Sequence, residues 1–232
     1  MSRYIDDGES GNPFSTQRAI KLFKQSVQDG QLLLEYYTEC FGELTKMLKL
    51  MGSIFRFSDI LYKRHKKIMT RLQTGKNAQH YFTAQDMFEF EKDQKKQPGS
   101  AVFREFHITA VLCVRILERY CQLERFNIKM TEPTMEVYME VCYPIHSKLM
   151  NKAHMMAIKQ LPMMDAYMKR VYPHISDSEE LHKVARSEMA AAGQVAREIT
   201  LVTEDLMIKY GFRDIIALLP GGKNHKERET VI

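Results

Sequence analysis

Apolar residues recur at spacings of three and four along most of the chain, which is the period of an amphipathic α-helix. The clearest stretch has Leu33, Tyr37, Phe41, Leu44 and Leu48 on one face. Nowhere do apolar and polar residues alternate with the two-residue period of a half-buried strand. The sequence therefore predicts an all-α fold, and it contains no internal repeat.

Clusters of Gly, Pro, Asn and Ser divide this pattern into separate helices. The side chains suited to cap a helix start are Ser15 or Thr16, Thr83, Asp165, and one of Ser176, Asp177 and Ser178. The predicted helices cover about residues 16–27, 32–51, 53–72, 83–96, 101–123, 137–150 and 153–161, a short stretch after 165, and 178–209.

Length and composition indicate one globular unit. The chain has 232 residues, 44% of them hydrophobic, which is enough for one sizeable core. No linker rich in Gly, Ser or Pro divides it, so we expect a single domain over 16–220. Polar residues with Gly and Pro predict a flexible arm over 1–15, and the charged end predicts a disordered tail over 221–232.

The cysteines favour a reducing compartment. Cys40, Cys113, Cys121 and Cys142 have neither CxxC nor CxH spacing and lie on helical stretches, so we expect reduced core thiols and a cytoplasmic protein. No apolar run approaches the roughly 18 residues that a membrane span requires. The amino terminus also lacks the apolar core of a signal peptide.

The charge of the chain is mildly basic, with a net charge of +5 and a pI of about 8.9. That balance suits an anionic membrane surface. The basic run 63–67 lacks a stacking aromatic at its centre and is explained as a solvated helix face, so no nucleic-acid partner is predicted. No Ser-His-Asp order, metal cluster or Gly-rich phosphate loop occurs, so we predict no enzyme activity, no cofactor and no metal.

One histidine stands out because it occupies an apolar stripe. His146 follows Val137, Val141 and Ile145 at helical spacing, where Leu or Val is the usual structural choice. Pro144 removes a helical donor or kinks the helix just before it. The residue types leave two interpretations open: a core histidine bonded to a backbone carbonyl, or a binding residue.

The motif around this histidine consists of Tyr138, His146, Ala153, Ala157, Leu161, Pro162 and Tyr167. In order and spacing it resembles a motif of the glycolipid transfer protein superfamily. The family's His-Pro-Trp is His146-Ser147-Lys148 here, which keeps the histidine and removes an aromatic used for membrane contact. Weaker matches in the same order extend the resemblance over about residues 30–220, and the end of the chain is most similar to the ceramide-1-phosphate branch.

The resemblance implies a fold and a function. The fold is a two-layer helical sandwich of about eight helices that encloses a lipid-chain pocket. The function is that of a non-enzymatic, monomeric sphingolipid carrier, cytoplasmic and in transient contact with anionic membranes. His146 is expected to bond the amide carbonyl of the sphingolipid.

The family's carboxylate and cation on its second helix can be matched to two different pairs of residues here. An ungapped alignment places Leu61 at the Asp position and His65 at the Lys position. Asp59 and Lys63 reproduce the Asp-x3-Lys spacing two residues earlier, about 200° away around a helix. Asp59 is thus either a headgroup ligand, after a two-residue contraction, or a solvated surface charge.

Arg104 falls, within one residue of register, where the family has a Trp that stacks on sugars. The chain contains no Trp, which excludes an indole platform. Arg instead binds phosphate oxygens through charge-assisted bonds. The expected cargo is therefore a phosphate lipid such as ceramide-1-phosphate, bound by Asp59, Lys63, His65, Arg104 and His146. Arg104 paired with Glu105 or Asp93 on the surface is the alternative.

A second class of function fits the same residues. A lipid sensor or a helical protein-interaction module could keep the fold and lack transfer activity, as the displaced Asp and missing Trp suggest. The 16 methionines suit a pocket that reshapes around cargo, and they equally suit a filled core. The carrier predicts an apolar pocket between the helical layers, whereas the interaction module predicts that Met and Phe fill it.

Overall fold

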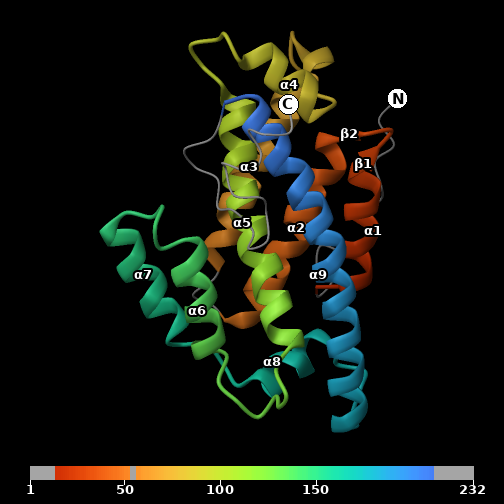
Figure 1. Cartoon of the computed structure of the whole chain (residues 1–232), viewed down its shortest axis with the longest axis vertical. Helices are drawn as coiled ribbons and strands as arrows, with labels where there is room; N and C mark the ends of the chain where they lie inside the picture. Colours follow the sequence, from red (N-terminus) through yellow and green to blue (C-terminus); the bar gives the residue numbers. More distant parts are fainter. Residues whose placement is uncertain (1–13, 53–55, 212–232) are drawn as a thin grey trace, which may run out of the picture.

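The computed structural model describes residues 14–52 and 56–211. These residues form nine α-helices, a short 3-10 helix and one small hairpin, which confirms the predicted all-α class (Figure 1). The elements are α1 (Thr16–Ser26), β1 (Val27–Gln28), β2 (Gln31–Leu32), α2 (Leu34–Met51), α3 (Arg56–Thr74), η2 (Ala78–His80), α4 (Ala84–Glu91), α5 (Pro98–Cys121), α6 (Thr131–Val141), α7 (Lys148–Ile158), α8 (Met164–Val171) and α9 (Ser178–Lys209).

The helices pack in two layers, as the resemblance implied. One layer contains α1, α2 and α3 as successive neighbours, and the other contains α9, α5, α6 and α7. The layers meet where α1 packs on α9 and where α2 and α3 pack on α5. In Figure 1 α7 lies at the left edge of the molecule and α1 and α9 lie on the right, with α5 between them.

Aromatic side chains fill the space between α2 and α5. The rings of Tyr37 and Phe103 stack with centroids 5.0 Å apart, and those of Phe41 and Phe106 stack at 4.3 Å. All four side chains are buried. Since burying one such side chain contributes about 2 kcal/mol, this cluster is a principal source of cohesion between the layers.

Three of the predicted caps are present. Ser15, Thr83 and Asp177 each accept a hydrogen bond from a backbone N–H in the first turn that follows. Asp165, also predicted to cap, lies instead inside the first turn of α8, whose cap position is Met163. There its carboxylate still faces the positive end of the helix dipole.

A short hairpin interrupts the helical pattern between α1 and α2, which the sequence analysis did not predict. β1 and β2 pair antiparallel around Asp29 and Gly30, which both have positive φ, at 51° and 74°. An Asp-Gly pair favours this tight turn. The strands are two residues long, too short for an alternating pattern to show.

α5 begins on a buried carboxylate. Glu91, fully buried at the end of α4, accepts hydrogen bonds from the backbone N–H of Gly99 at 2.9 Å and of Ser100 at 2.8 Å. The hydroxyl of Tyr81 donates to it at 2.9 Å. The anion thereby satisfies otherwise unpaired N–H groups at the positive end of a 24-residue helix.

The predicted helix over 137–150 is wrong in its second half. α6 ends at Val141 and α7 begins after Ser147, whose side chain accepts from the N–H of Met150 at 3.3 Å. Pro144 has no N–H to continue the helix and disfavours helical geometry at Tyr143. His146 therefore lies in a turn.

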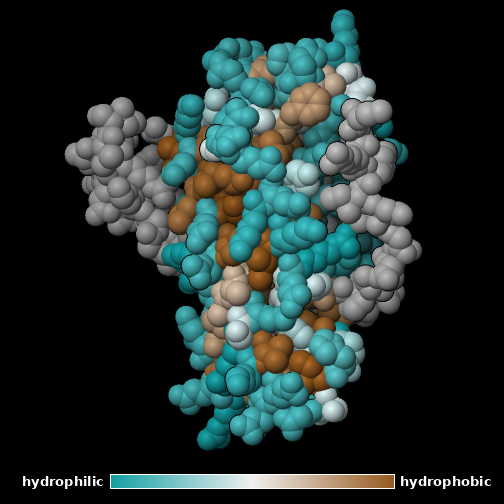
Figure 2. Space-filling model, turned by 90° about the vertical axis from the view of Figure 1, so that its right-hand side faces the viewer, coloured by the Kyte–Doolittle hydropathy of each residue, from teal (hydrophilic) through white to brown (hydrophobic). Residues whose placement is uncertain are grey.

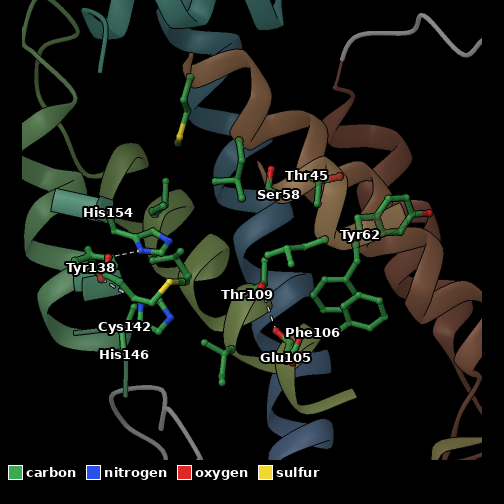
Figure 3. A pocket seen from close by; sticks show the side chains of 18 of the residues that line it. Thr45, Ser58, Tyr62, Glu105, Phe106, Thr109, Tyr138, Cys142, His146 and His154 are labelled. Atoms are coloured by element: carbon green, nitrogen blue, oxygen red, sulfur yellow. Dashed lines mark hydrogen bonds between the residues drawn. The ribbon is translucent and has the colours of Figure 1, made fainter. Parts of the chain in front are cut away.

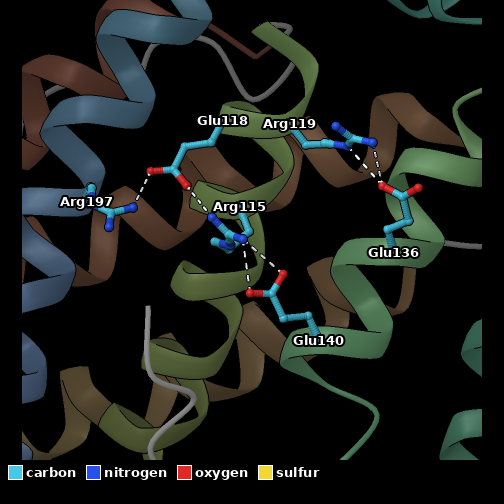
Figure 4. Close-up of polar contacts among 6 residues, drawn as sticks. All are labelled: Arg115, Glu118, Arg119, Glu136, Glu140 and Arg197. Atoms are coloured by element: carbon cyan, nitrogen blue, oxygen red, sulfur yellow. Dashed lines mark hydrogen bonds and ion pairs between the residues drawn. The ribbon is translucent and has the colours of Figure 1, made fainter. Parts of the chain in front are cut away.

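Ionic contacts connect the outer sides of α9, α5 and α6 (Figure 4). Glu118 on α5 accepts from Arg197 of α9 at 2.7 Å and from Arg115 at 2.9 Å. Arg115 also donates two bonds of 3.0 Å to Glu140 of α6. A connected network in which Arg115 bridges two carboxylates contributes more than isolated surface pairs, which are worth at most about 1 kcal/mol each.

The remaining structural expectations concern thiols, spans and chain ends. All four cysteines are free thiols. Among the described residues, no helix is long and apolar enough to cross a bilayer. The predicted arm lies outside the described residues except for Phe14, which is buried, and Ser15. The predicted tail lies wholly outside them.

Candidate functional site

An apolar cavity of about 150 Å³ lies between the two layers (Figure 3). Its walls come from α2, α3, α5, α6, the turn after α6, and α7. Apolar lining residues are Phe41, Leu48, Met51, Leu61, Phe106, Ile108, Leu112, Ile116, Met150 and Ile158. Polar ones are Thr45, Ser58, Tyr62, His65, Glu105, Thr109, Thr134, Tyr138, Cys142, His146 and His154.

α2 and α3 approach closely beside this cavity. A Cβ atom at Gly42 would lie 2.6 Å from the hydroxyl oxygen of Tyr62, so only glycine leaves that ring room. The ring of Tyr62 forms part of the cavity wall. The close approach of α2 and α3 at Gly42 thus determines the position of the Tyr62 ring in the cavity wall.

A hydrogen-bond network fixes His146 at the end of the cavity formed by α6 and α7. The Asn151 amide nitrogen donates to the carbonyls of Tyr143 at 3.0 Å and His146 at 3.3 Å. The Asn151 carbonyl oxygen therefore faces Tyr138, whose hydroxyl donates to it at 2.7 Å. With its one proton committed, the Tyr138 hydroxyl can only accept from His146 Nδ1, 3.1 Å away.

This chain of donors sets the tautomer of His146. The proton must be on Nδ1, which leaves Nε2 of the neutral ring as a hydrogen-bond acceptor. Burial, and then the neighbouring His154, lower the pKa of His146 below its ordinary value. The ring is consequently neutral at pH 7 and can accept a hydrogen bond from a ligand.

His154 extends the same polar wall. Its Nδ1 donates to the backbone carbonyl of Met150 at 2.8 Å. Its ring stacks on Tyr138 with centroids 5.4 Å apart and lies 4.9 Å from the ring of His146. In Figure 3 these three side chains lie together on one side of the cavity, beside Cys142, whose pKa burial raises to about 12.

The opposite wall carries an acid–histidine pair. His65 of α3, 8% exposed, donates from Nε2 to a Glu105 oxygen 2.5 Å away. Glu105 of α5 is 60% exposed, so it stands where the cavity meets solvent. Burial lowers the pKa of His65, Glu105 raises it and Arg64 lowers it, with a net decrease.

The structure places Asp59 and Lys63 together outside the cavity lining. Asp59 Oδ2 lies 2.9 Å from Lys63 Nζ, and its other oxygen lies 3.5 Å from Lys49 Nζ of α2. Partial burial raises the pKa of Asp59, but the two lysines outweigh that effect and the pKa is below its ordinary value. The α3 residues that line the cavity are instead Ser58, Leu61, Tyr62 and His65.

Arg104 is half-buried on α5, and it is the neighbouring residue, Glu105, that lines the cavity. Of the five predicted site residues, the structure brings His65 and His146 to the cavity. Glu105 and His154 also line the cavity and were not predicted as site residues. Because His146 lies in the turn before α7 and His154 lies on α7, their spacing of eight residues gave no signal that the two rings lie together.

Exposed side chains near the cavity differ between helices. α7 and the start of α3 expose large apolar residues, with Leu149 77%, Ile60 68% and Met156 59% exposed. Farther along α3, Lys63, Lys67 and Arg71 form an exposed basic face. On the other side of the molecule, which carries α1 and α9, hydrophilic side chains cover most of the surface around a central apolar band (Figure 2).

Metal ligation finds no support in the part of the chain that the structure describes. No group of three or more His, Cys, Asp or Glu side chains there could hold a metal ion. The described polar lining consists of hydroxyl, imidazole, carboxylate and thiol groups beside an apolar interior.

Comparison with known sequences identifies relatives of this chain. The model of the family described as Glycolipid transfer protein (GLTP) matches residues 32–173. A rat protein named ceramide-1-phosphate transfer protein is 31% identical over 85 residues, which are 35% of this chain and 38% of the rat protein. A mouse protein of the same name is 31% identical over 94 residues, covering 39% of this chain and 42% of the mouse protein. The aligned segment thus spans less than half of each relative's length.

Solved structures share the fold over a larger part of the chain. The apo form of mouse ceramide-1-phosphate transfer protein superposes with a TM-score of 0.75 at 19% identity, covering 88% of this chain and 100% of that one. The human protein in complex with 2:0 ceramide-1-phosphate gives a TM-score of 0.76 at 18% identity, with the same coverage. At this identity the likeness establishes the fold.

Proposed function

We propose, given that the chain belongs to the glycolipid transfer protein family, that it is a non-enzymatic carrier of a sphingolipid between membranes. The family match covers more than half of the chain, residues 32–173. The observation that best supports this function is the apolar cavity between the helical layers, with His146 held at its edge.

The size of the cavity indicates how cargo is accommodated. A volume of about 150 Å³ is that of a cavity for one benzene-sized molecule, whereas ligand pockets commonly measure about 300–1,000 Å³. Lipid chains therefore enter by separating the walls. The adaptable methionines Met51 and Met150 in the lining suit such reshaping.

The headgroup is the finer part of the proposal. The relatives' name supports a phosphate lipid such as ceramide-1-phosphate, which Arg104, Lys63 and His65 would neutralise while His146 and Asp59 orient the amide. The cavity lining favours a headgroup without negative charge, because no Lys or Arg is among its described residues. The position of Leu61 in the lining supports its assignment to the family's Asp position.

The surface supports a peripheral mode of action. Exposed apolar side chains on α7 and at the start of α3, with the basic face of α3, suit transient contact with an anionic bilayer. We propose a monomeric, cytoplasmic carrier that uses this side for membrane contact.

The test is vesicle-to-vesicle transfer of fluorescent ceramide-1-phosphate, ceramide and galactosylceramide by wild type, His146→Leu and Arg104→Leu. We expect transfer of at least one sphingolipid by the wild type and at least a tenfold loss in His146→Leu, with circular dichroism unchanged. Retained transfer of every lipid by His146→Leu would contradict the assigned role of this histidine.

A well-folded wild type that transfers none of these lipids would overturn the carrier proposal. Binding without transfer would then identify a lipid sensor, and the absence of binding would identify a helical interaction module. The modest size of the cavity is the observation that keeps this second function under test.

A further inference from the structure

The polar residues of the cavity have an unexpected charge balance for a phosphate binder. Among the described lining residues, the acid is Glu105 and the bases are three histidines, His65, His146 and His154. Arginine and lysine, which usually neutralise phosphate groups, are not among them. Among the described lining residues, the full charge offered to a headgroup is therefore that of the Glu105 carboxylate and not that of a lysine or arginine.

Glu105 is positioned to meet that headgroup. One carboxylate oxygen of Glu105 lies 2.5 Å from Nε2 of His65 on α3, and this bond holds the Glu105 side chain in place. The carboxylate remains 60% exposed, and an ionised carboxylate has about four acceptor positions. It can thus accept hydrogen bonds from a ligand while it keeps its bond to His65.

The other side of the cavity also offers an acceptor. The network of Asn151 and Tyr138 places the proton of His146 on Nδ1, so the neutral ring presents the lone pair of Nε2. Two acceptors, one of them anionic, complement a ligand that brings N–H or O–H donors. A phosphate brings acceptors and negative charge instead.

On this basis, and resting on the proposed carrier function, we infer that the cargo is a sphingolipid whose polar end donates hydrogen bonds and carries no negative charge. Ceramide, with two hydroxyls and an amide N–H, and a free sphingoid base, with an ammonium group, have this chemistry. Glu105 is the specificity-determining residue, since it repels phosphate and accepts from hydroxyl or ammonium groups.

Two arginines beside the His65–Glu105 pair could instead favour a phosphate lipid. Arg64 adjoins His65 and is exposed, and Arg104 adjoins Glu105 and is half-buried. If either one reached a phosphate at the mouth, ceramide-1-phosphate would be preferred despite Glu105. The experiment must therefore compare lipids that differ only at the headgroup.

The experiment measures transfer and equilibrium binding of ceramide, sphingosine and ceramide-1-phosphate by the full chain, with one acyl chain for both ceramides. The variants are Glu105→Gln and Glu105→Arg, with Glu89→Arg as the control. Glu89 lies on α4, is 58% exposed, does not line the cavity, and gives the same change in net charge.

We expect the wild type to prefer ceramide or sphingosine over ceramide-1-phosphate by at least tenfold. Glu105→Arg should reverse that preference, Glu105→Gln should reduce it, and Glu89→Arg should leave it unchanged. A wild type that prefers ceramide-1-phosphate, with Glu105→Arg no better at binding it, overturns this inference and leaves the carrier proposal standing. Folded protein that neither binds nor transfers any of the three lipids overturns both.

Discussion

Asn151 illustrates how a single buried side chain determines what a neighbouring residue can bind. Its amide nitrogen is committed to two carbonyls of the turn after α6, which leaves its oxygen to receive the Tyr138 proton. Because Tyr138 donates to Asn151, it must accept from Nδ1 of His146, and Nε2 of His146 is left as an acceptor for a ligand. The position of His146 alone would not have determined the direction of this bond.

Removal of the Tyr138 hydroxyl tests this network. In Tyr138→Phe, the Asn151 oxygen and the His146 Nδ1 proton both lose their partner, while the ring remains. We expect a loss of about 1–2 kcal/mol in the free energy of unfolding and at least a tenfold loss of lipid transfer, because His146 can then adopt either tautomer. Urea unfolding and the transfer assay measure the two effects. Tyr36→Phe, on the partly exposed side of α2, is the matched control.

A second histidine should make stability depend on pH. His107 is fully buried, donates from Nδ1 to Thr203 at 2.8 Å, and has its pKa lowered by burial to about 4. The unfolded chain, with an ordinary pKa near 6.5, binds more protons below that pH. The stability that this group contributes is present above about pH 6.5 and is lost as the pH falls toward 4.

The expected loss from His107 is about 2 kcal/mol between pH 7 and pH 5. Urea unfolding at both pH values measures it, with His107→Gln as the comparison, because glutamine cannot acquire a proton there. The variant should lose that much less stability than the wild type over the same interval. Equal pH dependence of stability in the two proteins would contradict a lowered pKa for His107.

At the level of elements, helical period and capping chemistry predicted most of the fold because both act over one or two turns. The starts of α1, α4 and α9 follow directly from Ser15, Thr83 and Asp177. The end of α6 was predicted wrongly because the helical spacing of apolar residues continues past Pro144, whereas the helical backbone does not. Glu105 was missed because its contact with His65 depends on how α5 is rotated against α3, which a sequence leaves undetermined.

The start of α5 provides a test of element stability. In Glu91→Gln one of the oxygens that receive backbone N–H groups becomes an NH₂ donor, and the charge that faces the helix dipole disappears. We expect a loss of about 2–3 kcal/mol in the free energy of unfolding, measured by urea denaturation. Glu89→Gln, exposed on the same helix, should leave stability unchanged.

At the scale of the whole molecule, two layers of helices enclose a cavity smaller than its expected cargo. The walls come from five helices that also form the core, so loading should move helices as well as side chains. The network of Arg197, Glu118, Arg115 and Glu140 ties α9, α5 and α6 together.

A substitution that fills the cavity tests whether this space is used. Leu112→Trp adds an indole to the lining of a 150 Å³ cavity. We expect at least a tenfold loss of lipid transfer, with a loss of stability below the roughly 1–3 kcal/mol of an overpacked core, because the added volume enters existing space. Phe82→Trp, 60% exposed and outside the lining, adds an indole without this effect. Undiminished transfer by Leu112→Trp would show that cargo binds elsewhere.

Gly42 shows that a residue can shape the cavity without lining it, because it leaves room for the ring of Tyr62. Any side chain at 42 displaces a ring that forms part of the wall, although residue 42 itself does not line the cavity. A substitution at this position of α2 would therefore change the shape of the cavity without changing any residue that lines it.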